Sequence, residues 1–296
     1  MIRNVHLLFL IVALTLLTSC IQDEDLSLPD TSVSEDLADE TADDMGNEPE
    51  NPPTDDPGDN PTEDDSDDTP EETTDDPTDG NSEDSDCTDA SSFVFQEANA
   101  LLMVEFEDGA FEASSKWEFV EDNQVSGGTY GVWEGTDNFN SPGSGLVRFK
   151  LDIQNPGVYR FSWKTAVKMG DNGTEHNDSW LRFPDAADFY GEKNGSKVYP
   201  GDTGKTPNPN GSSKDGWFKV YRSGNDLGFK WQARTSDNDA HDIYVEFGST
   251  GEYTMEVSGR SSAHAIDQFV LYQEAVYTKN EATAVTTFSE IHCNGS

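Results

Sequence analysis

Val147-Arg148-Phe149-Lys150-Leu151-Asp152-Ile153 is a stretch in which apolar residues alternate strictly with charged ones. Successive side chains of a β-strand point to opposite faces, so this stretch places one face in a core and the other in water. The same period recurs at 159–164, 243–247 and 253–257, with turn-forming Gly, Pro and Asn residues between the repeats. No stretch of helical period reaches normal helix length, and the one helical turn that we expect lies at 185–188. We therefore predict an all-β fold, an antiparallel β-sandwich of the jelly-roll type.

The composition changes abruptly near residue 90. Residues 91–296 are rich in Trp, Tyr, Phe, Val and Gly, and their number suffices for one single-core domain. Residues 21–90 contain 29 Asp and Glu and no Lys or Arg. Such a segment has too little apolar surface to offset the entropy of ordering it, and its like charges repel one another. We predict a disordered acidic linker at 20–90, a tether that spans about 45 Å as a flexible coil.

The formal net charge of -41 belongs mainly to this tether. Of the 59 acidic residues, 29 lie in the tether and 30 remain, against 17 Lys and Arg once Arg3 is also set aside. The predicted domain is therefore still acidic. Because phosphate backbones repel such a surface, we expect no nucleic-acid partner.

An apolar run from Val5 ends in Leu17-Thr18-Ser19-Cys20. The run has the length of a signal-peptide core and is too short to span a bilayer. The tetrapeptide resembles the lipobox of bacterial lipoproteins, which implies a signal peptide at 1–19 and lipidation of Cys20. An uncleaved anchor or a plain secretory signal is the alternative. The acidic stretch that follows, Gln22–Asp25, resembles the export signal of Bacteroidetes lipoproteins and implies the outer membrane, with the protein facing the cell exterior.

The other two cysteines stand at the borders of the predicted domain, Cys87 before its first strand and Cys293 near its end. In an oxidising envelope compartment we expect them to pair and join the two ends of the sandwich. Two free thiols are the alternative.

Four strand-like segments resemble non-catalytic carbohydrate-binding modules of the family 6, family 35 and malectin-like group. They are Leu102–Glu107, Gly157–Phe161, Gly251–Val257 and Ala265–Leu271. In that group a Glu-x-Glu pair of the first strand and an Ile-Asp pair of the last meet at a structural calcium. The resemblance implies calcium held by Glu105, Glu107 and Asp267, which suits a hard cation that takes several oxygen ligands. The alternative is a set of exposed carboxylates on a sheet face. The Tyr and Trp pair that clamps the sugar in those families has no clear counterpart here.

Two short segments, each immediately before a predicted strand, concentrate polar and imidazole groups: residues 174–180 and 235–242. Sugar recognition requires hydrogen-bonding side chains for adjacent hydroxyls and an aromatic ring against the apolar face of the sugar. We therefore predict a sugar site on loops at one end of the sandwich. Its candidate residues are Trp133, His176, Asn177, Asp178, Trp180, Asp239, His241 and His264. Trp133, in a Gly-rich turn, is the residue expected to be an exposed aromatic plate; Trp180 and Trp231 are further candidates, with burial in the core as the alternative.

A long segment, 191–216, is rich in Gly, Pro, Asn, Ser and Lys and lacks periodic apolar residues. Loops of this length in compact domains are often binding loops. Its local excess of lysine would suit a uronic or sulfated polysaccharide, and a solubilising surface loop is the alternative.

These observations favour a lipid-anchored protein that binds polysaccharide or oligosaccharide at the cell surface and holds it for separate glycan-degrading enzymes or transporters. We expect no catalytic activity, because no nucleophile elbow, metalloprotease helix, phosphate loop or alginate-lyase strand motif is present. Two alternatives remain. One is a polysaccharide lyase or glycoside hydrolase on a jelly roll, whose acid and base the available His, Asp and Glu could supply. The other is a protein-adhesion or structural surface lipoprotein.

Overall fold

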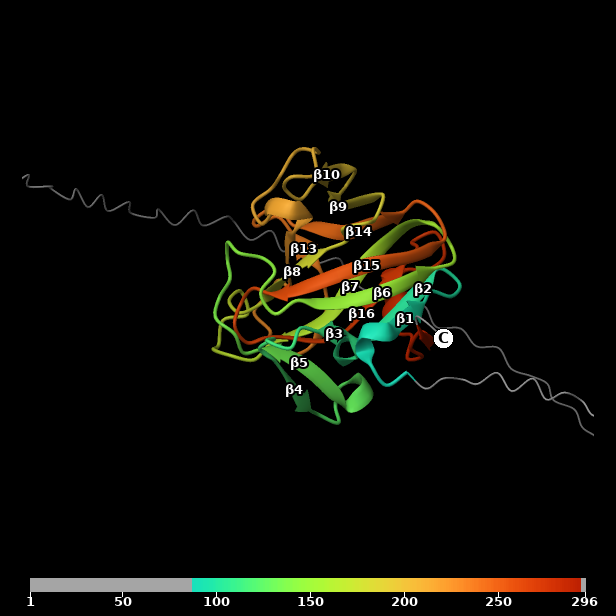
Figure 1. Ribbon diagram of the computed structural model, residues 1–296. Helices are drawn as coiled ribbons and strands as arrows, with labels where there is room; N and C mark the ends of the chain where they lie inside the picture. The colour runs from blue at the N-terminus through green and yellow to red at the C-terminus, as the bar shows by residue number, and fades with distance from the viewer. Residues whose placement is uncertain (1–86, 294–296) are drawn as a thin grey trace, which may run out of the picture. The chain divides into compact units, whose positions relative to one another are not determined.

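The computed structural model describes residues 87–293 (Figure 1). The predicted signal peptide, the lipidation residue Cys20 and the acidic segment up to residue 86 lie outside the described residues. Nearly all regular structure within 87–293 is β-strand, which confirms the predicted all-β class. No helix in this range is long and apolar enough to cross a membrane.

The strands of the described range form one hydrogen-bonded network that folds into two layers. In the first layer, β16 lies between β7 on one side and both β2 and β5 on the other; β7 continues to β14, β9 and β10. Its strands are β2 (Leu101–Glu105), β4 (Trp117–Glu121), β5 (Thr129–Trp133), β7 (Gly157–Val167), β9 (Asp188–Lys193), β10 (Ser196–Val198), β12 (Lys230–Trp231), β14 (His241–Phe247) and β16 (His264–Tyr272).

The second layer runs from β17 through β1, β6, β15 and β8 to β11. Its strands are β1 (Phe93–Gln96), β3 (Ala110–Phe111), β6 (Val147–Ile153), β8 (Asp178–Arg182), β11 (Phe218–Tyr221), β15 (Gly251–Gly259) and β17 (Ile291–Cys293). The short strand β13 (Arg234–Thr235) pairs with β11 and with β14, so it connects the two layers at one side. Every pairing is antiparallel except that of β1 with β6.

The core lies between the two layers, as the alternating pattern predicts. Val147, Phe149, Leu151 and Ile153 of β6 are buried, while the charged residues between them are at least partly exposed. The Phe149 ring contacts the ring of Phe269 on β16, with 5.0 Å between centroids. Aromatic contacts of this kind stabilise a core beyond the area that they bury.

Two local expectations need correction. Residues 184–187 form a turn and bend without a helix, and Asp188 begins β9. The one α-helix of the described range is α1 (Lys279–Thr283), where Thr278 and Glu281 form a capping box. The segment 191–216 is more regular than expected, because β9 and β10 form a hairpin and η4 (Lys214–Gly216) follows.

A disulfide joins Cys87 to Cys293, whose Cα atoms are 5.6 Å apart. The adjoining strands β1 and β17 pair, with Phe93 opposite Cys293. The bond therefore links the two ends of the described domain and restricts its unfolded state, which favours the folded one.

Candidate functional site

The two polar segments that the sequence singles out meet at a surface hollow of about 640 Å³, which we call the Lys219 hollow. Residues from 174–180 line one side and residues from 235–242 line the other, with β11 between them. The lining side chains are Thr174, Asn177, Asn210, Lys219, Tyr221, Arg222, Ser223, Asp237, Asn238 and Ala240. Amide, hydroxyl, carboxylate and ammonium groups thus surround one phenol ring.

Lys219 and Tyr221 face this hollow because β11 alternates. Phe218 and Val220 point into the core, and the residues between them point outward. Lys219 Nζ is 2.6 Å from Asp237 Oδ1 and 5.3 Å from the centroid of the Tyr221 ring. The Tyr221 hydroxyl donates to the carbonyl of Ser236, and burial raises the pKa of Tyr221 to about 12. At neutral pH the hollow therefore presents a neutral phenol and a lysine whose charge is balanced by Asp237.

Arg222 holds the back of the hollow in place although its side chain is fully buried. Its guanidinium donates to the backbone carbonyls of Thr165, Leu227 and Gly228, and pairs with Asp226 Oδ2 at 2.7 Å. Asn177 Nδ2 donates in turn to the Arg222 carbonyl. The guanidinium is buried whereas the Asp226 side chain is 56% exposed, so Arg222 fixes the loop at 223–229 chiefly through its hydrogen bonds to the carbonyls of Leu227 and Gly228.

Trp133, the expected exposed plate, is instead a core residue, and that prediction is wrong. The side chain is 3% exposed, packs against Trp117 and donates from Nε1 to the Thr136 carbonyl. The surrounding glycines do not mark an exposed turn; they let the backbone lie against the indole. A Cβ added at Gly259 would come within 2.2 Å of the ring.

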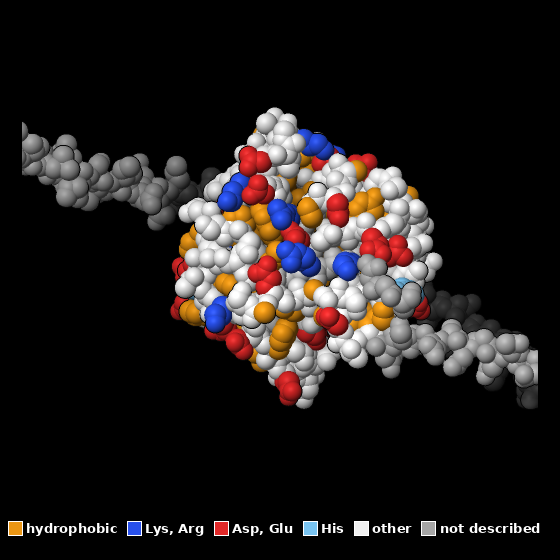
Figure 2. Space-filling view, viewed as in Figure 1, with side chains coloured by type: hydrophobic (Ala, Val, Ile, Leu, Met, Phe, Trp, Pro, Cys, Tyr) orange, Lys and Arg blue, Asp and Glu red, His pale blue; other side chains and the backbone are white. Residues whose placement is uncertain are grey.

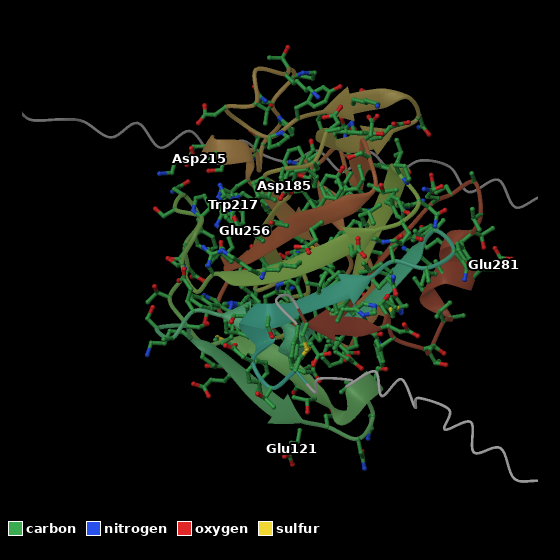
Figure 3. All side chains as sticks on the ribbon, turned by 45° about the vertical axis from the view of Figure 1, so that its right-hand side comes forward. Glu121, Asp185, Asp215, Trp217, Glu256 and Glu281 are labelled. Carbon is green, nitrogen blue, oxygen red and sulfur yellow. A yellow bond between two sulfur atoms is a disulfide. The ribbon has the colours of Figure 1, made fainter. Side chains whose placement is uncertain are left out.

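Trp180 is also buried, on the outer face of the second layer, and is no more available as a plate than Trp133. It packs with Leu146 and Trp217, and its Nε1 donates to the Asn138 carbonyl. Arg182 covers Trp217, with its guanidinium carbon 4.6 Å from the ring centroid. The Arg182 Nε also donates to Glu256, which Figure 3 labels together with Trp217. The candidate Trp231 packs partly buried against the core cluster around Tyr272.

Three further candidates are buried and cannot contact a ligand in this structure: Asp178, His241 and His264. Asp178 accepts two hydrogen bonds of 2.6 Å from Arg260. His264 contacts Ser179 Oγ through Nδ1, and burial lowers its pKa to about 3, so it is neutral. His241 contacts the Asp239 carbonyl through Nδ1. These side chains position the loops and do not present donors to solvent.

His176 and Asp239 lie nearer the surface but do not line the Lys219 hollow. His176 Nδ1 is 2.7 Å from the Ser262 carbonyl oxygen, and Asp239 pairs with Lys193 at 2.6 Å. Of the eight predicted ligand residues, Asn177 alone lines this hollow. Lys219 and Tyr221 are lining residues that the prediction missed, although the alternation Phe218-Lys219-Val220-Tyr221 is visible in the sequence.

The lysines of 191–216 do not form a continuous basic surface. Lys193 and Lys205 pair with Asp239 and Asp188, and Lys197 lies over the Tyr190 ring. On the face seen in Figure 2, Lys and Arg side chains are interspersed with Asp and Glu. This arrangement gives no particular support to an anionic glycan as the ligand.

A cluster of buried carboxylates lies where β2 and β16 pair. Glu105 ends β2, Glu107 belongs to η2 (Phe106–Asp108), and Asp267 lies at a register irregularity of β16. Both carboxylate oxygens of Glu105, Oε2 of Glu107 and Oδ1 of Asp267 are buried without a hydrogen-bond partner. Lys164 Nζ pairs with the other Asp267 oxygen at 2.8 Å. Buried polar atoms are normally hydrogen-bonded, so these orphaned oxygens fit a site for a cation.

The electrostatics of this acidic cluster are consistent with such a site. Burial, with a further contribution from neighbouring carboxylates, raises the pKa of Glu105 to about 8 and that of Glu107 to about 7. Gly127, at φ 65°, lets η3 (Ser126–Gly128) approach, since a Cβ there would lie 2.5 Å from Glu105 Oε1. No group of three His, Cys, Asp or Glu side chains within 87–293 stands at metal-binding spacing. Glu105, Glu107 and Asp267 are therefore not arranged as a three-carboxylate ligand set in this structure, and the calcium site stays a prediction.

No protein-family model matches the chain, and no curated protein matches it in sequence. The structure is similar to the C-terminal family 6 carbohydrate-binding module of a marine laminarinase from Zobellia galactanivorans, with 13% identity, a TM-score of 0.28, and coverage of 58% of this chain and 99% of the module. A family 6 module from Clostridium cellulolyticum, solved with xylose, gives 13% identity, a TM-score of 0.29, and coverage of 58% and 96%. A Podospora anserina mannanase with a family 35 module gives 12% identity, a TM-score of 0.34, and coverage of 62% and 29%. The chain thus spans less than a third of the mannanase.

Proposed function

We propose that the domain at 87–293 binds a glycan in the Lys219 hollow. The observation that carries this proposal is the lining of the hollow: Asn210, Asp237 and Asn238 offer hydrogen-bonding groups at the surface, above the largely buried Asn177 and Tyr221, which are 7% and 8% exposed. Its volume, about 640 Å³, is that of a small-ligand site. Vicinal hydroxyls of a sugar match closely spaced amide and carboxylate groups, and an aromatic ring contacts the C–H face of a pyranose.

We propose further that binding is not followed by catalysis. Glycoside hydrolysis normally uses two carboxyl groups on either side of the scissile bond. Asp237 is the one carboxylate among the residues that line the hollow, and it is paired with Lys219. No histidine lines the hollow either. The charge balance of the Lys219–Asp237 pair favours a neutral glycan over a uronic or sulfated one.

The test is a binding screen of residues 87–293 against plant and marine glycans by affinity electrophoresis, with a reducing-sugar assay on the same panel. We expect Lys219→Met to weaken binding by about 1–3 kcal/mol, because the ammonium contacts both Asp237 and the Tyr221 ring that a sugar would meet. Lys214→Met, an exposed lysine outside the hollow, is the matched control and should bind as the unmodified domain does. Equal loss in both variants would remove the hollow as the site, and release of reducing sugar would show an enzyme.

A calcium ion at the acidic cluster is the second part of the proposal. Glu105, Glu107 and Asp267 would hold it with their orphaned oxygens. When bound, the ion would neutralise carboxylates that the fold buries, and so fasten β2 to β16. This role is structural, since none of the three residues lines the Lys219 hollow.

We also propose that the protein is a lipoprotein of the outer membrane, anchored through Cys20 and facing the cell exterior. There it would hold polysaccharide for separate enzymes or transporters. Cys20→Ala should prevent lipid attachment, so the variant should not incorporate labelled fatty acid and should no longer fractionate with membranes. A Cys20→Ala protein that is still labelled and still sediments with the outer membrane would contradict the anchor. Ser19→Ala, which keeps a small residue before the Cys, is the control.

A further inference from the structure

A second hollow adjoins the Lys219 hollow. It has a volume of about 520 Å³ and is lined by Glu192, Lys193, Asn194, Arg234, Ala240, Asp242 and Tyr244. We call it the Tyr244 hollow. Ala240 lines both hollows, so a methyl group is part of the boundary between them. Arg234, which lines the Tyr244 hollow, approaches Ser223, which lines the Lys219 hollow, with 3.5 Å between Arg234 Nη1 and Ser223 Oγ.

The strand register places side chains of both hollows in one row. Tyr221 on β11 is directly opposite Arg234 on β13, Arg234 is opposite Asp242 on β14, and Asp242 is opposite Glu192 on β9. Directly opposite residues of antiparallel strands share a face of the sheet. Adjacent strands lie about 4.8 Å apart, so the row from β11 to β9 is about 14 Å long. Figure 1 shows β9, β13 and β14 in the upper half of the domain.

The Tyr244 hollow has the chemistry of a sugar subsite. The Tyr244 and Tyr190 rings are cross-strand neighbours, inclined by only 13° with centroids 5.7 Å apart. Arg160 is the neighbour of Tyr244 on the other adjacent strand, and its guanidinium carbon lies 5.9 Å from the Tyr244 centroid, so the partly exposed Tyr244 ring is held between Tyr190 and Arg160. Asp242 is held between Arg160 and Arg234. A carboxylate with two guanidinium partners is held in one orientation beside the partly exposed ring of Tyr244.

We propose that the two hollows form one extended groove, and that its ligand is a polysaccharide segment lying across β11, β13, β14 and β9. This inference rests on the proposed glycan-binding function of the Lys219 hollow. A single sugar fills one hollow, whereas a chain of four or more residues crosses Ala240 and reaches Tyr244. The groove therefore selects polymers over mono- and disaccharides.

The experiment is isothermal titration of residues 87–293 with cello-, laminari-, xylo- and manno-oligosaccharides of two to six units. Affinity for the recognised series should rise at least tenfold between two and five units. Tyr244→Ala should lower affinity for the pentasaccharide at least fivefold and leave the disaccharide unchanged, whereas Lys219→Met should weaken both. Glu192→Gln lies at the partly exposed end of the row and does not disturb the core. Like Tyr244→Ala, it should lower affinity for the pentasaccharide and leave affinity for the disaccharide unchanged.

Three outcomes overturn the groove, and they differ from failure of the function itself. Affinity that is independent of length, or equal losses for the short and long ligands in Tyr244→Ala, would confine the ligand to the Lys219 hollow while leaving glycan binding intact. Replacing Ala240 by Gln places a larger side chain between the two hollows and should narrow the passage that joins them. The rise of affinity with oligosaccharide length should then disappear, and an unchanged rise would also contradict the groove. No binding by any oligosaccharide or glycan of the screen would reject the proposed function and this inference together.

Discussion

Replacement of Trp133 by alanine should lower the free energy of unfolding of the domain by about 3–5 kcal/mol. The indole is buried, contacts Trp117 and donates a hydrogen bond to the Thr136 carbonyl. Gly135, Gly145 and Gly259 lie directly against the ring, so their backbone cannot collapse into the space without moving three segments. Urea unfolding followed by far-UV circular dichroism would measure the loss.

Phe139→Ala is the matched control for this prediction. Phe139 is an aromatic residue close in sequence to Trp133, but it is 48% exposed and rests on Arg260. Its removal should cost less than about 1 kcal/mol, as most surface substitutions do. If Trp133→Ala unfolds at the same urea concentration as the unmodified domain and instead loses glycan affinity, the indole is a ligand plate and the core assignment is wrong.

The sandwich could be predicted from sequence because its determinants are local. The alternation of Val147–Ile153 predicts a strand with one buried face whatever its neighbours are. The structure places that strand between β1 and β15. The proximity of Glu105 to Asp267 could be predicted through the family resemblance, which places both residues on terminal strands that pair. Gln268 lies opposite Glu105 in the structure.

The candidate sugar site could not be predicted residue by residue, because the exposure of a side chain depends on which distant segments of the chain pack over it. His264 precedes an apolar run and reads as a loop residue, yet it begins β16 and is buried, with the Arg222 charge near enough to help lower its pKa. The glycines around Trp133 indicate a flexible turn in sequence, whereas in the fold they provide close contact. The segments 174–180 and 235–242 both contribute residues to the lining of the Lys219 hollow. What sequence could not supply was which of their side chains point into it.

The metal-free domain should lose stability as the pH rises from 5 to 9. Burial raises the pKa of Glu105 to about 8 and that of Glu107 to about 7 in the folded state, above their ordinary value of 4.5. Their contribution is therefore fully present below pH 4.5, where both states are protonated, and is lost as the pH rises through 7 and 8. We expect a loss on the order of 2 kcal/mol, well below the roughly 8 kcal/mol that the two full shifts would give, because solvent screens carboxylates that are only half enclosed. A loss of that size corresponds to about 4–8 °C in a domain of this size.

Calcium should reverse this dependence, because it stabilises the ionised carboxylates that burial penalises. Differential scanning calorimetry at pH 8 should show a melting temperature at least 5 °C higher in 1 mM calcium than in EDTA, and the two curves should converge at pH 5. Glu105→Gln should reduce both the loss with pH and the calcium effect, whereas Glu118→Gln, an exposed carboxylate on β4, should change neither. Coincident curves in calcium and EDTA at pH 8 would exclude a structural calcium, even if the loss of stability with rising pH is observed, since buried carboxylates alone account for that loss.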